Sequence, residues 1–451
     1  MSNRSGRLGL RDKVFLGALA LALLVNLWMV DSLRDEVAKL RKAQGTGPVT
    51  EALAEPSAQV TEDSAAAPAG EAASSADRTS LPVAQPPGGS QAGVSKAAIK
   101  IGTVVTQTGL VDMSPIVRGL SAWVQHVNAE GGVNGRRIEL VVEDDGTDTS
   151  RGSAAIRKLV ENDKVFALVG ECAPLSDVQN IEYLKQKGVP VIGSCILPTD
   201  QFKTNRYQFA LRPSPDTEGR ITGKYAAKDM GAKKPAVIVL DQQLMVEMGN
   251  GTVAQWKAMG VKDYVVETVA ATNPNFTPTV VRLRSQGVDN VTLLLDSAST
   301  IRFLQAAAQQ GWKPPMLSIS SYDEEVNRYA GEQAEGTVVP GFTEYLVTNG
   351  PQQRQFRADM QRFYPQGGVR LELATGGYHP AQVFTDVLGK LGDDVTRERF
   401  INGMESLTNY DDGWEPPYTL RSGNHETARA AKFAVVKEGR VVPITGQWYY
   451  L

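Results

Sequence analysis

The run from Ala98 to Asp148 limits what this chain can fold into more than any other stretch. It opens with Ile99 to Val105, a segment rich in β-branched residues that predicts a strand buried on both faces. A helical pattern follows, with Ser114 as its expected N-cap and Pro115 at the first helical position. A second apolar run, Ile138 to Val142, completes a β-α-β unit. Such a unit places two parallel strands under one crossing helix.

The chain beyond this unit keeps alternating between strand-like and helix-like stretches. Further strands are expected at Val165–Gly170, Val189–Ser194, Ala236–Leu240, Tyr264–Val269, Val291–Leu295 and Met316–Ser320. Helices are expected to begin near Ser150, Ser176, Asp216, Glu247, Thr277, Ser299 and Asp323. The strands fall into two sets separated near Arg212–Pro215. The fold class is therefore α/β, with two doubly wound parallel-sheet lobes in roughly 350 residues.

The N-terminal end differs in composition and is expected to hold the protein at a membrane. Residues 1–13 are basic, and residues 14–30 form a 17-residue run without charge, which predicts a transmembrane helix. The basic end is expected in the cytoplasm. No A-x-A cleavage site follows the run, which favours a retained single-pass anchor in the cell membrane over a cleaved signal peptide. The C-terminal receptor region is then extracytoplasmic.

Two further segments separate this apolar run from the lobes. Val30, Leu33, Val37 and Leu40 are spaced 3, 4 and 3 apart, which predicts a juxtamembrane helix over residues 31–43, either a short coiled coil or an isolated stalk. Residues 44–95 consist mainly of Ala, Pro, Ser, Gly, Glu and Gln without an aromatic residue. They cannot bury enough apolar surface to offset the entropy of ordering, so they predict a disordered linker.

Composition and motifs exclude several functional classes. The net charge is only −3 and the sequence has no basic stripe, so nucleic acid is not an expected partner. The three histidines are scattered and no H-E-x-x-H motif or cysteine cluster occurs, so no metal site is expected. No phosphate-binding G-x-x-x-x-G-K-[ST] loop is present, and no cofactor is expected. A catalytic nucleophile paired with a base is not visible either.

A resemblance to a known family joins these observations. A strand, a TQTG loop, a helix ending NAEGGVNGR and a strand ending EDD are similar to the start of type I periplasmic binding proteins. The similarity continues through Val165–Gly170, Gly188–Ile192 and AGEQAEGTVV at Ala330–Val339, and covers roughly Ala98 to Leu451. Within that family the chain most resembles the branched-chain amino acid and amide receptors of ABC importers.

The resemblance implies how the two lobes are connected. In the family the chain crosses between lobes three times, at positions that match Arg212–Asp216, Val339–Thr343 and a segment near Tyr410–Pro417. Lobe I would then hold residues 96–212 and 343–412, and lobe II residues 213–342 and 413–451.

Ligands of open parallel sheets bind beyond the carboxyl ends of the strands. Polar or loop residues at those ends predict a ligand site, with the contacts Gln107, Glu171, Ser194, Ile196, Gln243, Asp296 and Tyr322. Some residues near these ends can equally serve as helix caps, and Ser114, Ser176 and Asp323 are expected to do only that.

Cys172 and Cys195, the two cysteines, each follow one of two neighbouring strands. They are expected to form a disulfide across two ligand loops, with two buried free thiols as the alternative. The amino acid receptors use hydroxyl groups and free N–H groups in these stretches to hold an α-carboxylate, but Pro174 has no N–H. An amide-like or aromatic ligand is therefore as well supported as an α-amino acid.

The sequence thus predicts a membrane-anchored solute-binding protein rather than an enzyme. It would close two lobes on a small molecule and pass that molecule to an ABC permease. The alternative is a tethered sensor of the same fold that signals to a membrane partner. An extracellular α/β enzyme is a third class, disfavoured because no catalytic constellation is visible.

Overall fold

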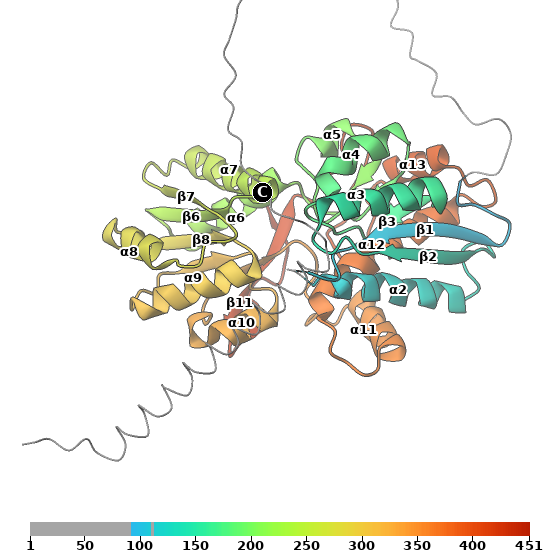
Figure 1. The fold of residues 1–451 in the computed structure, drawn as a ribbon. Coiled ribbons are helices and arrows are strands. Elements are labelled where there is room, and N and C mark those ends of the chain that lie inside the picture. The colour runs from blue at the N-terminus through green and yellow to red at the C-terminus, as the bar shows by residue number, and fades with distance from the viewer. Residues whose placement is uncertain (1–91, 110–111) are drawn as a thin grey trace, which may run out of the picture. The chain divides into compact units, whose positions relative to one another are not determined.

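The computed structural model describes residues 92–109 and 112–451 (Figure 1). The expected basic N-terminus, transmembrane helix, juxtamembrane helix and most of the linker therefore lie outside the described residues. Within the described part, no helix is both long and apolar enough to cross a membrane. The end of the expected disordered linker is ordered, because Val94 forms an antiparallel bridge with Ile99 and the Lys100 N–H donates to the Gly93 carbonyl at 2.8 Å.

Lobe I is built on a five-stranded parallel sheet. Its strands are β1 (Ala98–Val104), β2 (Arg137–Glu143), β3 (Ala167–Val169), β4 (Val191–Ile192) and β5 (Gln208–Phe209), in the order β2-β1-β3-β4-β5. The opening β-α-β unit is confirmed, since β1 and β2 pair in parallel with Ile101 opposite Leu140. Strand β5 was not among the predicted strands.

Helices cover both faces of this sheet (Figure 1). They are α2 (Ser114–Ala129), α3 (Thr149–Arg157), the π-helix η1 (Lys158–Asn162), α4 (Asp177–Gln186), α5 (Gln201–Thr204), α11 (Pro351–Phe363), α12 (Leu371–Lys390) and α13 (Arg397–Glu405). One core lies under α2, α12 and α13, where Leu120, Phe384 and Phe400 are buried together. A second core, with Ile156 and Leu184, lies under α3 and α4.

Lobe II holds an eight-stranded mixed sheet. Its strands are β6 (Pro235–Leu240), β7 (Val265–Val269), β8 (Asn290–Leu294), β9 (Met316–Ser318), β10 (Val338–Gly341), β11 (Ala430–Lys437), β12 (Arg440–Pro443) and β13 (Tyr449–Tyr450). The order is β12-β11-β10-β9-β8-β6-β7, and β13 pairs with β11. Strands β6 to β9 run parallel, as predicted, and β10, which was not predicted as a strand, is parallel to β9. Strand β11 is antiparallel to β10, β12 and β13. The antiparallel C-terminal edge was not predicted.

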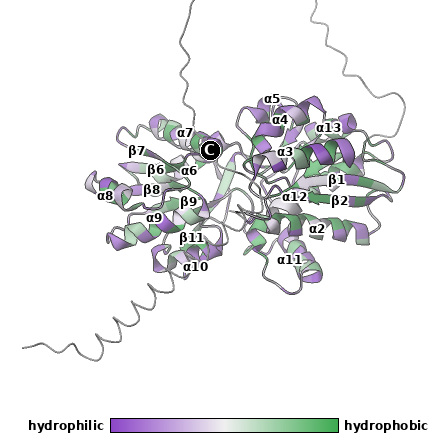
Figure 2. Ribbon diagram, viewed as in Figure 1, coloured by the Kyte–Doolittle hydropathy of each residue, from purple (hydrophilic) through white to green (hydrophobic). Residues whose placement is uncertain are grey.

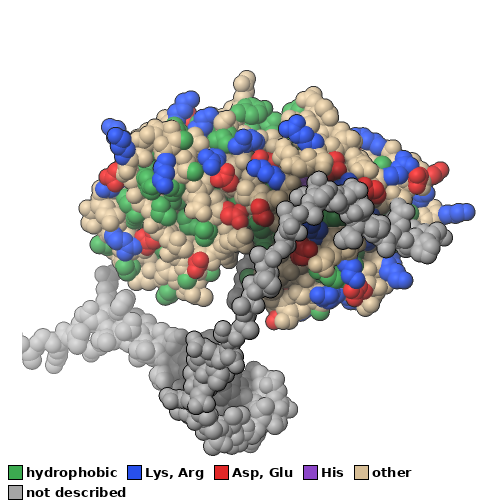
Figure 3. Space-filling model, turned by 90° about the horizontal axis from the view of Figure 1, so that it is seen from above, with side chains coloured by type: hydrophobic (Ala, Val, Ile, Leu, Met, Phe, Trp, Pro, Cys, Tyr) green, Lys and Arg blue, Asp and Glu red, His purple; other side chains and the backbone are tan. Residues whose placement is uncertain are grey.

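The helices of lobe II again form two layers (Figure 1). They are α6 (Pro215–Lys228), α7 (Gln243–Ala258), α8 (Thr277–Ser285), α9 (Ser297–Gln309), α10 (Glu324–Ala330) and the 3₁₀ helix η2 (Gly331–Gln333). On one face Met248 and Trp256 of α7 pack on Val237, and on the other Phe276 and Phe303 pack on Ile238. Figure 2 shows the hydrophobic residues concentrated in the strands of both lobes. Figure 3 shows basic and acidic side chains interspersed over the face in view.

Two of the three expected helix caps differ from the prediction. Met113 occupies the N-cap position of α2, and Ser114 is its first helical residue. Ser176 precedes α4, but its hydroxyl donates to Asp145 Oδ2 at 3.2 Å instead of capping the helix. Asp323 caps α10 as predicted, with Oδ1 accepting from the Glu325 N–H at 3.0 Å.

The third crossing segment lies later in the chain than expected. Tyr410 and Tyr418 pair with each other, and Tyr418 and Leu420 are buried in the core of lobe I. His425 still stacks on Phe209 of lobe I, with ring centroids 4.1 Å apart. The chain therefore crosses after His425 and before β11, not near Tyr410–Pro417. A boundary between residues 412 and 413 would cut a hairpin that belongs to lobe I.

Candidate functional site

The two lobes contact each other through strand-end loops, helix α7 and the segment just before α12. Arg370, just before α12 in lobe I, forms an ion pair with Asp323 in lobe II, with Nη1 and Oδ2 3.3 Å apart. The same guanidinium donates to the Asp112 carbonyl in the loop after β1. At another point the Thr199 N–H of lobe I donates to Glu247 Oε2 of α7 at 2.8 Å. These contacts define the inter-lobe interface.

A charged cluster lies beside the crossing segments, and we call Arg212, Glu218, Tyr322 and Glu415 the hinge cluster. Arg212 donates from Nε and Nη2 to the two carboxylate oxygens of Glu218, each at 2.8 Å. Burial raises the pKa of Glu218 to about 7 even though the Arg212 charge opposes it. Burial and the charge of Asp323 raise the pKa of Tyr322 to about 12. Each of these groups is therefore held where water solvates it poorly.

Glu415 is buried, and the charge of Arg212 and the nearby Thr427 hydroxyl compensate its carboxylate only in part. Its side chain is 4% exposed and neither carboxylate oxygen has a hydrogen-bond partner. Burial, and after it the charge of Asp412, raises the pKa of Glu415 well above its usual range. A buried carboxyl in this state favours a proton or a ligand that brings N–H or O–H donors.

Asp412 fixes the backbone that carries Glu415. Asp412 Oδ1 accepts from the N–H groups of Trp414 and Glu415, at 2.8 and 3.1 Å. Its Oδ2 lies 2.7 Å from His379 Nε2 and 3.0 Å from the Tyr418 hydroxyl. Burial alone would raise the pKa of Asp412, but the charge and hydrogen bond of His379 and the two backbone donors lower it. Glu415 thus stands on a rigid loop.

The crossing segments are tied to one another around this cluster. The Ser214 N–H and hydroxyl both donate to Glu426 Oε1, at 2.9 and 2.7 Å, which joins the first crossing to the third. The Glu344 N–H, just after β10, donates to the Trp414 carbonyl at 2.7 Å. Any rotation of one lobe against the other therefore acts on the loop that carries Glu415.

The architecture of two α/β lobes has a counterpart among known proteins. A family model described as "Periplasmic binding protein" matches residues 98–440. The chain belongs to the periplasmic binding protein family.

The relatives of this binding protein include proteins named for the amino acids that they bind. An amino acid binding protein of Pseudomonas aeruginosa is 30% identical over 179 residues, which are 39% of the chain and 47% of that protein. Leu/Ile/Val-binding protein homolog 2 of Brucella abortus is 26% identical over 65% of the chain and 83% of the relative. The match to the Pseudomonas protein thus spans about half of its length. Members of the family bind substrates and are not enzymes.

Solved structures share the two-lobe fold at low sequence identity. A fatty acid ABC transporter substrate-binding protein from Thermomonospora curvata matches with a TM-score of 0.70 and 21% identity, over 80% of the chain and 94% of that protein. A branched-chain amino acid ABC transporter protein from Thermus thermophilus, solved with bound valine, matches with a TM-score of 0.70 and 17% identity, over 79% and 97%. At these identities the likeness concerns the fold alone.

Several predicted ligand contacts of the binding protein already form hydrogen bonds with other residues of the protein. Ser194 Oγ donates to the carbonyl of Ile196 at 2.9 Å. Asp296 caps α9, with Oδ1 accepting from the Ser299 N–H at 2.7 Å. Gln243 begins α7, is exposed and donates to Glu247 Oε1 at 3.1 Å. Asp296 therefore acts as a helix cap, which was the alternative to ligand contact.

The other predicted contacts keep polar groups available. Gln107 is half-buried, and its backbone N–H rather than its side chain is held by Asp144 Oδ1 at 2.9 Å. Tyr322 belongs to the hinge cluster. Glu171 is 2% exposed, and its Oε1 has no hydrogen-bond partner among the described residues. Only Tyr322 lies in the hinge cluster, and the structure brings it there from lobe II.

Sequence reasoning missed Glu415, Glu218 and Arg370. Glu415 and Arg370 lie in irregular segments, where no periodic pattern marks a residue as buried. One signal was present in the sequence: the apolar neighbours Trp414, Pro416 and Pro417 flank Glu415 and favour a buried loop. Within the described residues, no group of three or more His, Cys, Asp or Glu side chains is arranged to hold a metal ion.

The predicted disulfide between Cys172 and Cys195 is confirmed. The sulfur atoms are 2.08 Å apart and the Cα atoms 5.2 Å apart. The bond joins the loops after β3 and β4, and the Cys195 N–H also donates to the Glu171 carbonyl at 3.0 Å. The alternative of two buried free thiols is wrong. The disulfide therefore holds the loops after β3 and β4 at a fixed distance from each other.

A Cys172→Ser/Cys195→Ser variant is expected to lose about 3 kcal/mol of its free energy of unfolding, because the loop closed over 23 residues is released in the unfolded chain. Urea unfolding followed by tryptophan fluorescence measures this loss. Adding reductant to the unmodified protein should reproduce it, and adding reductant to the double variant should change nothing. Equal stability of the oxidised and reduced proteins would contradict this prediction.

Proposed function

We propose that this protein is an extracytoplasmic receptor, anchored through residues 14–30, that captures a small organic molecule between its lobes and delivers it to an ABC importer. The observation that carries the proposal is the inter-lobe interface. It joins two α/β lobes through a few contacts, such as the ion pair between Arg370, just before α12, and Asp323, in the loop after β9. A ligand that touches both lobes binds their closed arrangement more tightly and so increases its population.

The ligand class we propose is an amino acid, an amide or a related small organic compound. The proposed contacts are Gln107, Glu171, Ser194, Ile196, Gln243, Asp296 and Tyr322, together with Glu415. Unpartnered acceptors at Glu171 and Glu415 favour a ligand that carries N–H donors over one whose only polar group is a carboxylate. The relatives named for branched-chain amino acids support this class, and the likeness to a fatty acid receptor reflects the shared fold.

Thermal unfolding of the purified full-length protein with candidate ligands tests the proposal. Branched-chain amino acids, their amides, aromatic acids and fatty acids would be compared at equal concentration. A true ligand at 100 times its dissociation constant stabilises the folded protein by about 2.7 kcal/mol, which raises the melting temperature measurably. If no member of these four classes raises it, a receptor for such compounds is excluded.

An Arg370→Gln variant is expected to bind the identified ligand about tenfold more weakly. The variant removes a charge-assisted contact that joins the lobes, and a tenfold change corresponds to about 1.4 kcal/mol. Isothermal titration calorimetry gives both affinities. Arg282→Gln is the matched control, because it removes the ion pair with Glu267 on the β7–α8 side of lobe II. Equal affinities for the two variants would show that the cross-lobe pair does not assist closure.

A further inference from the structure

The inter-lobe interface and the hinge cluster together hold more carboxyl groups than cations. The carboxyl groups that act electrostatically on Arg212 or Tyr322 come from both lobes: Glu218, Asp323, Glu372 and Glu415. Two guanidinium groups, those of Arg212 and Arg370, lie among them. Arg212 is paired with Glu218 and Arg370 with Asp323. Among the described residues, Glu372 and Glu415 therefore form no direct ion pair.

Glu415 is the carboxyl group of this set that water and the protein satisfy least. Its side chain is 4% exposed, and neither carboxylate oxygen accepts a hydrogen bond. The charge of Arg212 offsets the effects of burial and of Asp412 only in part. The loop cannot turn Glu415 outward, because Asp412 holds the Glu415 N–H at 3.1 Å. A ligand that brings N–H donors and a positive charge would supply what this carboxylate lacks.

Three backbone donors beside the disulfide are already used. The N–H groups of Cys172, Ala173 and Cys195 each donate to an acceptor within lobe I at 3.0 Å. Pro174 has no N–H. In the same loop, Glu171 is buried and its Oε1 accepts no hydrogen bond from a described residue. A ligand carboxylate would therefore meet a buried carboxyl group here instead of these donors.

Tyr322 brings an aromatic ring to the same region from lobe II. It lies in the loop after β9, is half-buried, and makes no ring–ring or cation–π contact with another described residue. The charges of both Arg212 and Arg370 act on its hydroxyl, so it lies between the hinge cluster and the cross-lobe ion pair. The face of a tyrosine ring attracts an ammonium group.

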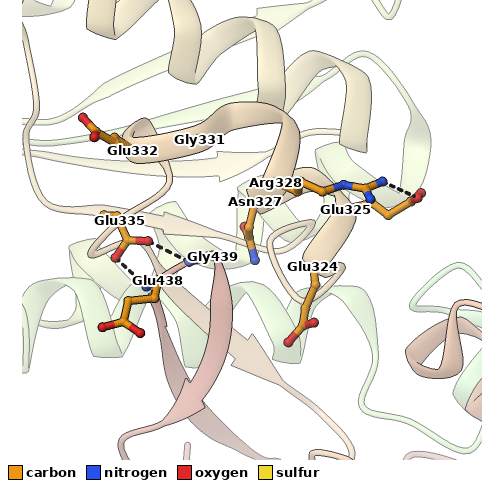
Figure 4. A pocket seen from close by; sticks show the side chains of 9 residues that line it. All are labelled: Glu324, Glu325, Asn327, Arg328, Gly331, Glu332, Glu335, Glu438 and Gly439. Carbon is orange, nitrogen blue, oxygen red and sulfur yellow. Dashed lines mark hydrogen bonds and ion pairs between the residues drawn. The ribbon is translucent and has the colours of Figure 1, made fainter.

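A surplus of carboxylates is not by itself a binding site, and a second acidic region of lobe II shows the difference. A hollow of about 600 Å³ there is lined mainly by glutamates (Figure 4). Glu335 accepts from the N–H groups of Glu438 and Gly439, and Glu325 is paired with Arg328. The other glutamates of the hollow are exposed, so water solvates them. Water has no such access to Glu415.

We propose that the ligand of this receptor is a small organic cation without a carboxylate, an amine or an amino acid amide, whose ammonium group is the counter-charge of Glu415. The inference rests on the proposed function and narrows its ligand class. An ammonium group brings N–H donors and the positive charge that the interface lacks. The ring of Tyr322 would cover one side of it. A metal ion fits less well, because no described carboxylates are grouped as metal ligands.

A series of compounds that share an isobutyl group tests the inference on the full-length protein at pH 7. The series is 3-methylbutylamine, L-leucinamide, 4-methylpentanamide, L-leucine and 4-methylpentanoate. Isothermal titration calorimetry should show that the amine and leucinamide bind at least tenfold more tightly than leucine. The anion 4-methylpentanoate should not bind, because it brings a further negative charge to buried carboxyl groups.

A Glu415→Gln variant tests the named counter-charge. It should weaken binding of the amine and of leucinamide at least tenfold and that of neutral 4-methylpentanamide less than threefold, because glutamine keeps the shape of the side chain and removes its charge. The control is Glu139→Gln, an exposed glutamate of β2 in lobe I, which should bind every compound as the unmodified protein does. Unchanged binding of the amine by Glu415→Gln would mean that Glu415 carries a proton and is not the counter-charge.

The outcomes separate this inference from the receptor function. Tighter binding of leucine or of 4-methylpentanoate than of the amine and leucinamide would overturn the inference and leave the receptor function supported. The same conclusion follows if neither cation binds but another compound raises the melting temperature. If no compound of this series or of the thermal unfolding series binds, the receptor function itself fails.

Discussion

A Gly377→Ala variant is expected to lose more than about 3 kcal/mol of its free energy of unfolding, the upper end of ordinary overpacking. A Cβ on Gly377 would lie 2.1 Å from the Ile116 carbonyl oxygen and 2.9 Å from the Leu120 nitrogen. Both contacts are with the backbone of α2, which cannot rotate away. Since a Cβ on Gly119 of α2 would likewise lie 1.8 Å from the Ala374 carbonyl oxygen, α2 and α12 must separate to admit either methyl group.

The same helix provides a matched control. Gly389 also lies in α12, and a Cβ there would meet nothing closer than Val133 Cγ1 at 3.9 Å. Gly389→Ala is therefore expected to stabilise the protein by up to about 1 kcal/mol, because alanine favours the helix over glycine. Urea unfolding monitored by circular dichroism measures both variants. Similar stabilities for the two would show that close backbone approach is not what holds α2 against α12.

This helix pair also positions the candidate site. Asp112 and Met113 lead into α2, and Arg370 leads into α12. Separating the helices would move Arg370 relative to the Asp112 carbonyl and to Asp323, the groups it joins across the lobes. Gly377→Ala should therefore weaken ligand binding as well as folding, whereas Gly389→Ala should leave binding unchanged.

The sequence was informative where a buried strand is bounded by polar or glycine residues. Strands β1, β2, β6 and β8 agree with their predicted ranges within a few residues, because each is a short apolar run with clear ends. Strands β3 and β4 are shorter than predicted, since the chain leaves the sheet early to form the loops that carry Cys172 and Cys195. The disulfide followed from the order of those two strands.

The sequence was less informative where contacts join distant segments. Strand β11 pairs with β10 through Val435 and Val338, residues that no local pattern relates. The hinge cluster likewise brings Arg212 near Glu415 across half of the chain. From the sequence alone, a charged residue in an irregular segment is expected to be exposed to solvent. Only the fold shows that Glu415 is buried. Predicting the site thus required the positions of the crossing segments. The sequence-based prediction placed the third crossing near Tyr410–Pro417, earlier in the chain than the structure does.

Glu171 is expected to make stability fall as the pH rises. Burial raises its pKa from 4.5 to about 8. The folded protein therefore keeps a proton that the unfolded chain releases between pH 4.5 and 8. Because the folded state binds more protons, the free energy of unfolding decreases across this window. This contribution to stability is present below pH 4.5 and is lost as the pH passes 8.

Glu171→Gln should weaken this dependence, because Asp177 keeps the part that its own burial causes, and should be more stable than the unmodified protein above pH 8, by more than about 1 kcal/mol. The amide cannot ionise, and it relieves Asp177, whose own pKa is raised by burial and by the charge of Glu171. Urea unfolding at several pH values between 4.5 and 9 measures the effect, with the exposed Glu139→Gln as control. A pH profile for Glu171→Gln that matches the control would show that Glu171 carries no stored proton.

A stability gain of this kind bears directly on the role of Glu171. Glu171 lies after β3 among the proposed contacts, and its burial destabilises the folded protein at alkaline pH. Functional groups often combine such a cost in stability with a position in the binding site. We therefore expect Glu171→Gln to combine higher stability above pH 8 with weaker binding of an N–H-bearing ligand. Higher stability with unchanged binding would instead place Glu171 outside the ligand site, and the acceptor for such a ligand would have to be Glu415 alone.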